Sequence, residues 1–216
     1  MEKNEKMEPS IEEESTIVED YDEKIKIMII GDSTVGKTSL LRKYIQNEFS
    51  SNFINTVGFD IQIKFLNINN KKIKLQISDT AGQERYRIVS KNFFNASEGF
   101  IIVYDITKRE SFVNVNNWVE QIKEIAPNYS KSIIFGNKCD LKEMRDIDIN
   151  EGKELANKFN FKFFETSAKE GININEGFEA LVKEIMGDIM SVKSRRNDTT
   201  ILKKKKHKVK KSEPCC

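Results

Sequence analysis

The chain has 216 residues, enough for one domain of roughly 150 to 200 residues with tails. Apolar residues make up 38% and charged residues 32%, and only three prolines and ten glycines are present, which excludes collagen-like and proline-rich architectures. Although the net charge is only +2, the two ends of the chain are oppositely charged, since residues 1–23 carry −8 and residues 193–216 carry +8. Because the middle is nearly neutral, we expect no nucleic-acid binding by the body of the protein.

The chain shows no segment for crossing a membrane or for export. No stretch approaches the roughly 18 apolar residues of a membrane-spanning helix, and the polar start lacks the apolar core of a secretory signal. Three cysteines cannot form a disulfide framework, and no Cys-x-x-Cys spacing indicates zinc. We therefore expect a reducing, intracellular compartment.

Short apolar runs alternate with segments of helical period along the chain. Strands are predicted at 24–30, 60–68, 72–78, 100–104, 132–135 and 161–164, with Asn69-Asn70 as a hairpin turn. Helices are predicted after Thr38 and over the stripes at 112–122, 155–159 and 178–189. This order predicts a three-layer α/β fold with a mostly parallel six-stranded sheet and one antiparallel hairpin. Ligands bind such sheets at the carboxyl ends of the strands.

A glycine-rich motif follows the first predicted strand. Residues 31–38, Gly-Asp-Ser-Thr-Val-Gly-Lys-Thr, match G-x-x-x-x-G-K-[ST] between a strand and a helix. The backbone N–H groups of such a loop wrap phosphate oxygens at a helix N-terminus. Lys37 would reach the β- and γ-phosphates, and the Thr38 hydroxyl would bind Mg²⁺. The expected nucleotide contacts here are Ser33, Thr34, Val35, Gly36, Lys37, Thr38 and Ser39.

A second motif indicates which base the bound nucleotide carries. Residues 137–140, Asn-Lys-Cys-Asp, follow a predicted strand and match N-K-x-D. The Asp140 carboxylate can accept hydrogen bonds from guanine N1–H and the exocyclic amine, a donor pair that adenine lacks. We expect Asn137, Lys138 and Asp140 to bind the base.

A third motif, Asp79-Thr80-Ala81-Gly82-Gln83, ends the predicted strand at 72–78. Asp79 would hold Mg²⁺ through a water, Gly82 would bring its N–H to the γ-phosphate, and Gln83 would orient the attacking water. Lys37 and Gln83 are therefore the expected catalytic residues.

A fourth motif, Glu165-Thr166-Ser167-Ala168-Lys169, follows the last predicted strand, and there the Ala168 N–H would bond the guanine carbonyl.

In this order the four motifs resemble a small GTPase of the Ras superfamily, and within it the Rab family, over about residues 24–190. Further matches are Thr56-Val57-Gly58, the segment at 103–107 and the terminal Cys215-Cys216. The resemblance implies a P-loop NTPase fold, a second Mg²⁺ hydroxyl from Thr56, and Phe49 packed against the guanine. An ordinary core aromatic is the alternative for Phe49.

The resemblance also implies a function and partners. It implies a GTP/GDP switch with slow intrinsic hydrolysis, Mg²⁺ as cofactor, and membrane recruitment of effectors in vesicle traffic. The expected partners are an exchange factor, an activating protein, and an escort or GDP-dissociation-inhibitor-type chaperone, with the GTPase itself a monomer. Ser78 and Ile61 stand where Rab proteins usually carry aromatics that face effectors, with Phe93 as the third of the set.

Two alternatives remain open. A GTP-binding scaffold with negligible hydrolysis is opposed by Gln83. A P-loop nucleotide kinase or ATPase would need an adenine site, and Asn137 to Asp140 favour guanine instead.

The ends are predicted to be disordered tails, at 1–23 and 193–216, around a GTPase domain at 24–192. The acidic first tail carries no motif. The basic run at 203–211 precedes Cys215-Cys216, which predicts a prenylated anchor on the cytosolic face of a membrane. Each basic residue near an anionic leaflet contributes about 1 kcal/mol, and a lipid chain supplies the second signal that stable attachment needs.

Overall fold

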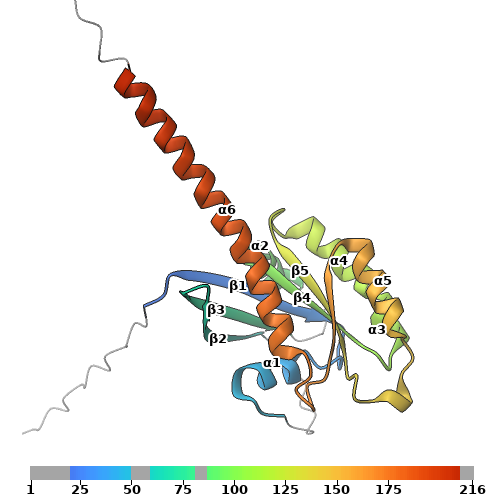
Figure 1. Ribbon diagram of the computed structural model, residues 1–216. Coiled ribbons are helices and arrows are strands. Elements are labelled where there is room, and N and C mark those ends of the chain that lie inside the picture. Colours follow the sequence, from blue (N-terminus) through green and yellow to red (C-terminus); the bar gives the residue numbers. More distant parts are fainter. Residues whose placement is uncertain (1–19, 50–58, 81–86, 210–216) are drawn as a thin grey trace, which may run out of the picture.

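The computed structural model describes residues 20–49, 59–80 and 87–209. Strands and helices alternate through these residues (Figure 1). The elements are β1 Glu23–Gly31, α1 Lys37–Gln46, β2 Phe59–Ile68, β3 Lys71–Thr80, α2 Arg87–Ala96, β4 Gly99–Asp105, α3 Arg109–Val113, α4 Val115–Ile125, β5 Lys131–Asn137, a 3₁₀ turn at Lys142–Met144, α5 Ile149–Phe159, β6 Lys162–Thr166 and α6 Ile174–Val209.

The six strands form one sheet in the order β2-β3-β1-β4-β5-β6. All neighbouring pairs are parallel except β2 with β3, which is an antiparallel hairpin. Its turn is Asn69-Asn70, whose φ angles of 51° and 60° suit the tight turns of hairpins. The predicted fold class is therefore confirmed.

Two apolar cores flank the sheet (Figure 1). Alternate residues of β1 point to opposite sides, so that Ile27 and Ile29 join α1 and α6 while Met28 and Ile30 join α2, α4 and α5. Every residue of β4 is buried, as expected of a central parallel strand covered on both faces. This packing fixes the strand ends that carry the motifs.

The helices differ from the prediction in two places on the α2–α5 side. Helix α2 was not predicted, because its apolar stripe is short; Phe94 is its anchor in the core. The single stripe predicted at 112–122 is divided at Asn114, which ends α3 and begins α4. At this break between α3 and α4, the Asn114 side chain donates to Asp32 Oδ2 at 2.7 Å.

Helix α6 continues to Val209, well past the predicted domain boundary at 192. The chain is helical over residues 193–209, and the domain bounds themselves stay a prediction. No glycine or proline interrupts residues 188–209, and lysine, arginine and leucine favour helix, so a helix already packed on the sheet can propagate. Both tail cysteines and the acidic segment before Asp20 lie outside the described residues.

None of the helices among the described residues is long and apolar enough to cross a membrane.

Candidate nucleotide site

The loop between β1 and α1 has the backbone that its glycines permit. Gly31 has φ 140° and Gly36 has φ 99°, a region that residues with a Cβ rarely adopt. An added Cβ at Gly31 would lie 2.2 Å from the Val103 carbonyl oxygen, and one at Gly36 would lie 2.4 Å from Asn137 Nδ2. Helix α1 begins directly after Gly36, and no side chain caps its N-terminus. The N-terminus of a helix favours an anion.

Lys37 lies beneath this loop, only 5% exposed. Its ammonium donates to the carbonyls of Gly31 at 2.8 Å and Asp32 at 2.7 Å. Burial lowers the pKa of Lys37 to about 8, while the charges of Asp79 and Asp32 oppose that shift. The cation is thus held close to the loop that is expected to wrap phosphate.

Thr38 and Asp79 meet although 41 residues separate them. The Thr38 hydroxyl donates to Asp79 Oδ2 at 2.5 Å. Asp79 is 1% exposed, and its Oδ1 is buried without a hydrogen-bond partner among the described residues. Burial raises the pKa of Asp79, and the Thr38 hydrogen bond and the Lys37 charge oppose the rise.

This pair fits the donor set of Mg²⁺. The ion prefers oxygen ligands and is usually bound by one or two carboxylates together with waters and phosphate oxygens. The buried Asp79 Oδ1, which has no hydrogen-bond partner among the described residues, is of the oxygen type that the ion prefers. Within the described part of the chain, no group of three or more acidic, histidine or cysteine side chains could hold a metal by itself.

Asn137, at the end of β5, links the base motif to the phosphate loop. It is 1% exposed, its Nδ2 donates to the Val35 carbonyl at 2.8 Å, and its Oδ1 accepts from the Thr166 hydroxyl at 3.2 Å. The carboxyl ends of β4, β5 and β6 also lie side by side, because Asn137 on β5 pairs with Asp105 on β4 and with Thr166 on β6. Three of the four motifs therefore meet at one edge of the sheet.

The remaining base residues lie beside it. The Ser167 hydroxyl donates to Asp140 Oδ1 at 2.6 Å, which fixes one carboxylate oxygen. The Cys139 N–H donates to the Thr166 carbonyl at 3.0 Å and joins the two loops. Ala168 is 5% exposed, and Lys169 points outward, where its ammonium lies 3.7 Å from Glu170.

Lys138 turns back to the phosphate loop. Its backbone is left-handed, with φ 69°, and its ammonium donates to the Thr34 carbonyl at 3.0 Å. The same ammonium lies 2.6 Å from Asp105 Oδ2, and this carboxylate is fully buried. Lys138 thus holds the phosphate loop through the main-chain carbonyl of Thr34.

Some predicted residues lie at the margin of the site or outside the described chain. Phe49 is 42% exposed, which excludes the alternative of a core aromatic. Ser33 is exposed and Ser39 is half-buried on α1. Thr56, Gly82 and Gln83 lie outside the described residues, as do Cys215 and Cys216.

Three supporting contacts were missed by the sequence analysis. Asp32 accepts from Trp118 Nε1 at 2.9 Å as well as from Asn114, so the phosphate loop is attached to α4. Arg145 forms a two-point ion pair with Glu165, with Nη2 to Oε2 at 2.9 Å, and braces the loop before Ser167. Asp32 directly follows β1 and Glu165 lies near the end of β6, but the partners of these two carboxylates could be found only from the fold.

The positions expected to face effectors lie on neighbouring strands. Ile61 on β2 pairs with Ser78 on β3 and is 42% exposed. Ser78 is only 4% exposed and adds little surface, and Phe93 on α2 is half-buried.

A mixed α/β sheet with a phosphate loop at one strand end and an Asn-Lys-x-Asp motif at another is the architecture of a P-loop protein with a guanine-type base site. A family model described as the Ras family matches residues 26–187. Ras-related protein Rab-3C of Bos taurus is 42% identical over 196 residues, which cover 91% of this chain and 86% of that protein. Ras-related protein Rab-8 of Diplobatis ommata is 45% identical over 166 residues, covering 77% and 79%, and Rab-13 of Rattus norvegicus is 40% identical over 186 residues, covering 85% and 92%.

The chain therefore belongs to the Ras family, as a Rab-like small GTPase that hydrolyses GTP.

Proposed function

We propose that residues 33–39 bind the phosphates, that Asn137, Lys138, Asp140 and Ser167 to Lys169 bind guanine, and that Phe49 covers the base. The observation that carries this assignment is the hydrogen bond from Asn137 to the Val35 carbonyl, which joins the base motif to the phosphate loop across 102 residues. The buried Lys37 ammonium supplies positive charge at the phosphate end, where a polyanion would displace its carbonyl partners.

We further propose that Thr38, Thr56 and Asp79 hold Mg²⁺. The ion would neutralise charge on the β- and γ-phosphate oxygens. The supporting observation is Asp79 Oδ1, which is buried and unpaired beside the Thr38 hydroxyl. Gln83 would orient the attacking water and Gly82 would donate to the γ-phosphate. We expect the accelerating Arg to be supplied by an activating protein, so the unassisted rate should lie below about 1 s⁻¹.

The switch would act through the segments that contain Thr56 and Gln83. GTP would order them through γ-phosphate contacts and hydrolysis would release them. An exchange factor, an activating protein and effectors would recognise the two states. Membership of the Ras family, with Rab proteins as relatives, supports these partner classes.

The membrane attachment is a proposal as well. Cys215 and Cys216 would carry prenyl groups beside the basic run at 203–211, an escort or GDP-dissociation-inhibitor-type chaperone would carry the lipids, and the protein would act on the cytosolic face of a membrane in vesicle traffic.

Calorimetric titration tests the base site. Wild-type protein should bind GDP and GTP and show no comparable affinity for ATP. Asp140→Asn should lose guanine affinity and gain affinity for xanthine nucleotides, because the extra carbonyl of xanthine needs a donor where guanine needs an acceptor. Glu143→Gln, an exposed carboxylate three residues further on, is the matched control and should behave as wild type. Equal affinity of the wild type for ATP and GTP would contradict the assignment.

A further inference from the structure

Thr34 has an unfavourable backbone conformation at the outer part of the phosphate loop. Its φ is 67°, in the left-handed region, which is uncommon for a β-branched residue. Two ammonium groups from different strand ends converge on it. Lys138 donates to its carbonyl at 3.0 Å, and Lys108, from the loop after β4, donates to its hydroxyl at 2.8 Å. Lys108 belongs to none of the nucleotide motifs.

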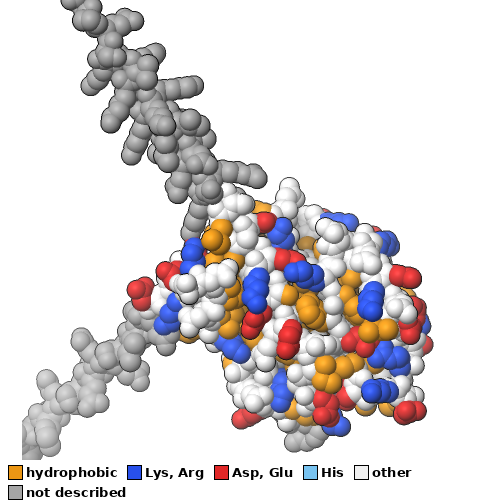
Figure 2. Space-filling model, viewed as in Figure 1, with side chains coloured by type: hydrophobic (Ala, Val, Ile, Leu, Met, Phe, Trp, Pro, Cys, Tyr) orange, Lys and Arg blue, Asp and Glu red, His pale blue; other side chains and the backbone are white. Residues whose placement is uncertain are grey.

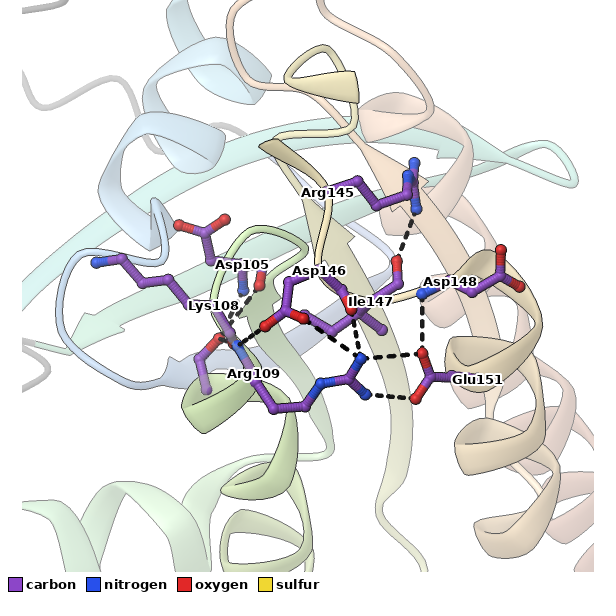
Figure 3. Close-up of polar contacts among 9 residues, drawn as sticks. Asp105, Lys108, Arg109, Arg145, Asp146, Ile147, Asp148 and Glu151 are labelled. Atoms are coloured by element: carbon purple, nitrogen blue, oxygen red, sulfur yellow. Dashed lines mark hydrogen bonds and ion pairs between the residues drawn. The ribbon is translucent and has the colours of Figure 1, made fainter. Parts of the chain in front are cut away.

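The loop that carries Lys108 is held on both sides (Figure 3). The Lys108 N–H donates to the Asp105 carbonyl at 2.9 Å, and the Ser111 hydroxyl donates to the Lys108 carbonyl at 2.8 Å. The next residue, Arg109, donates its N–H to Asp146 Oδ2 at 3.2 Å and binds both carboxylate oxygens of Glu151 on α5. Lys108 therefore extends from a loop fixed to β4 and α5, although its side chain is exposed.

We propose that Lys108 is a positioning residue for nucleotide retention, which ties the phosphate loop to the β4–α3 loop through the Thr34 hydroxyl. The inference rests on the proposed phosphate site. Release of a bound nucleotide requires the loop N–H groups to separate from the phosphates, and a loop tied at Thr34 to two strand ends resists that movement. The ammonium also adds positive charge beside a loop that binds a polyanion.

The expected effect is modest. A hydrogen bond contributes about 0.5–1.5 kcal/mol net, and this one is exposed. Its loss should therefore speed release of GDP by about three- to tenfold, since tenfold corresponds to about 1.4 kcal/mol. Single-turnover hydrolysis should change little, because the contact is made to the loop and not to the γ-phosphate side of the site.

The test is a double-mutant cycle on the full chain, read by the release rate of a fluorescent GDP analogue. Lys108→Met keeps the length of the side chain and removes the donor. Thr34→Val keeps the β-branch, and hence the backbone cost, and removes the acceptor, whereas Thr34→Ser keeps the hydroxyl. Lys153→Met, an exposed lysine on α5, is the charge-matched control.

We expect Lys108→Met and Thr34→Val each to speed release, the double variant to be no faster than the faster single variant, Thr34→Ser to release the nucleotide more slowly than Thr34→Val, and Lys153→Met to stay within twofold of wild type. The inference is wrong if Lys108→Met stays within twofold of wild type, or if the two single effects multiply in the double variant, since independent loosening would produce that result. A wild type that retains no guanine nucleotide would instead refute the nucleotide site itself.

Discussion

Asn137→Ala should weaken both the fold and the binding of nucleotides of any base. The Asn137 amide is buried and satisfies two groups, the Val35 carbonyl at 2.8 Å and the Thr166 hydroxyl at 3.2 Å. Removing it leaves both buried without a partner, at about 1–3 kcal/mol for each group. The free energy of unfolding should therefore fall by about 2–6 kcal/mol.

Thermal unfolding measures the first effect. In a domain of this size each kcal/mol lowers Tm by about 2–4 °C, so a decrease of about 4–24 °C is expected. Thr166→Val is the matched control. It removes only the hydroxyl at the longer of the two hydrogen bonds, so its decrease should be less than half as large.

Calorimetry with two nucleotides measures the second effect. Because Asn137 acts on the phosphate loop, its loss should weaken GDP and inosine diphosphate by the same factor. Asp140→Ala should weaken GDP more, since guanine alone has the exocyclic amine that Asp140 is expected to bind. The reasoning about Asn137 fails if Asn137→Ala leaves Tm unchanged, or if its effect is confined to guanine.

Three further changes probe the rest of the assignment. Gln83→Leu should slow GTP hydrolysis in a single-turnover assay by at least about tenfold while GTP affinity stays similar, and an unchanged rate would remove Gln83 from catalysis. Cys215→Ser with Cys216→Ser should leave a GTP-binding protein in the soluble fraction of lysed cells, whereas persistence on membranes would place the anchor elsewhere. Ser78→Trp with Ile61→Phe should raise the affinity of the GTP form for typical Rab effectors in pull-downs, at a stability cost of about 1–3 kcal/mol because Ser78 is buried; no gain would show that these departures do not govern effector choice.

The local sequence pattern was sufficient to predict the strands of the sheet and the phosphate loop. Alternating and continuous apolar runs are direct consequences of burial, so all six strands were found. Their ends were predicted one or two residues short, as at Gly136 and Asn137, because these residues join the ladder through the backbone alone. The positive φ angles of Gly31 and Gly36 also follow from residue type.

Contacts between distant segments could not be predicted in this way. Trp118 is a core-type residue by pattern, yet its indole N–H binds Asp32, 86 residues earlier. From the sequence alone, Lys108 is expected to be an ordinary solvated lysine. It contacts Thr34, 74 residues earlier, because β1 and β4 are neighbouring parallel strands whose carboxyl ends lie close together. Figure 2 shows basic and acidic side chains interspersed over the visible face, so charge alone would not have distinguished Lys108 or Asp32 from other charged residues.

The Asn69-Asn70 turn offers a place to label the protein. The hairpin brings Phe59 opposite Thr80 at the end of β3 that carries Asp79, so the turn between Ile68 and Lys71 lies at the other end of the same two strands. Both asparagines are exposed. A short epitope or dye-binding peptide inserted between them would sit a full strand length from the phosphates, and it would leave untouched the two oppositely charged ends of the chain, where a conventional fusion would have to be placed.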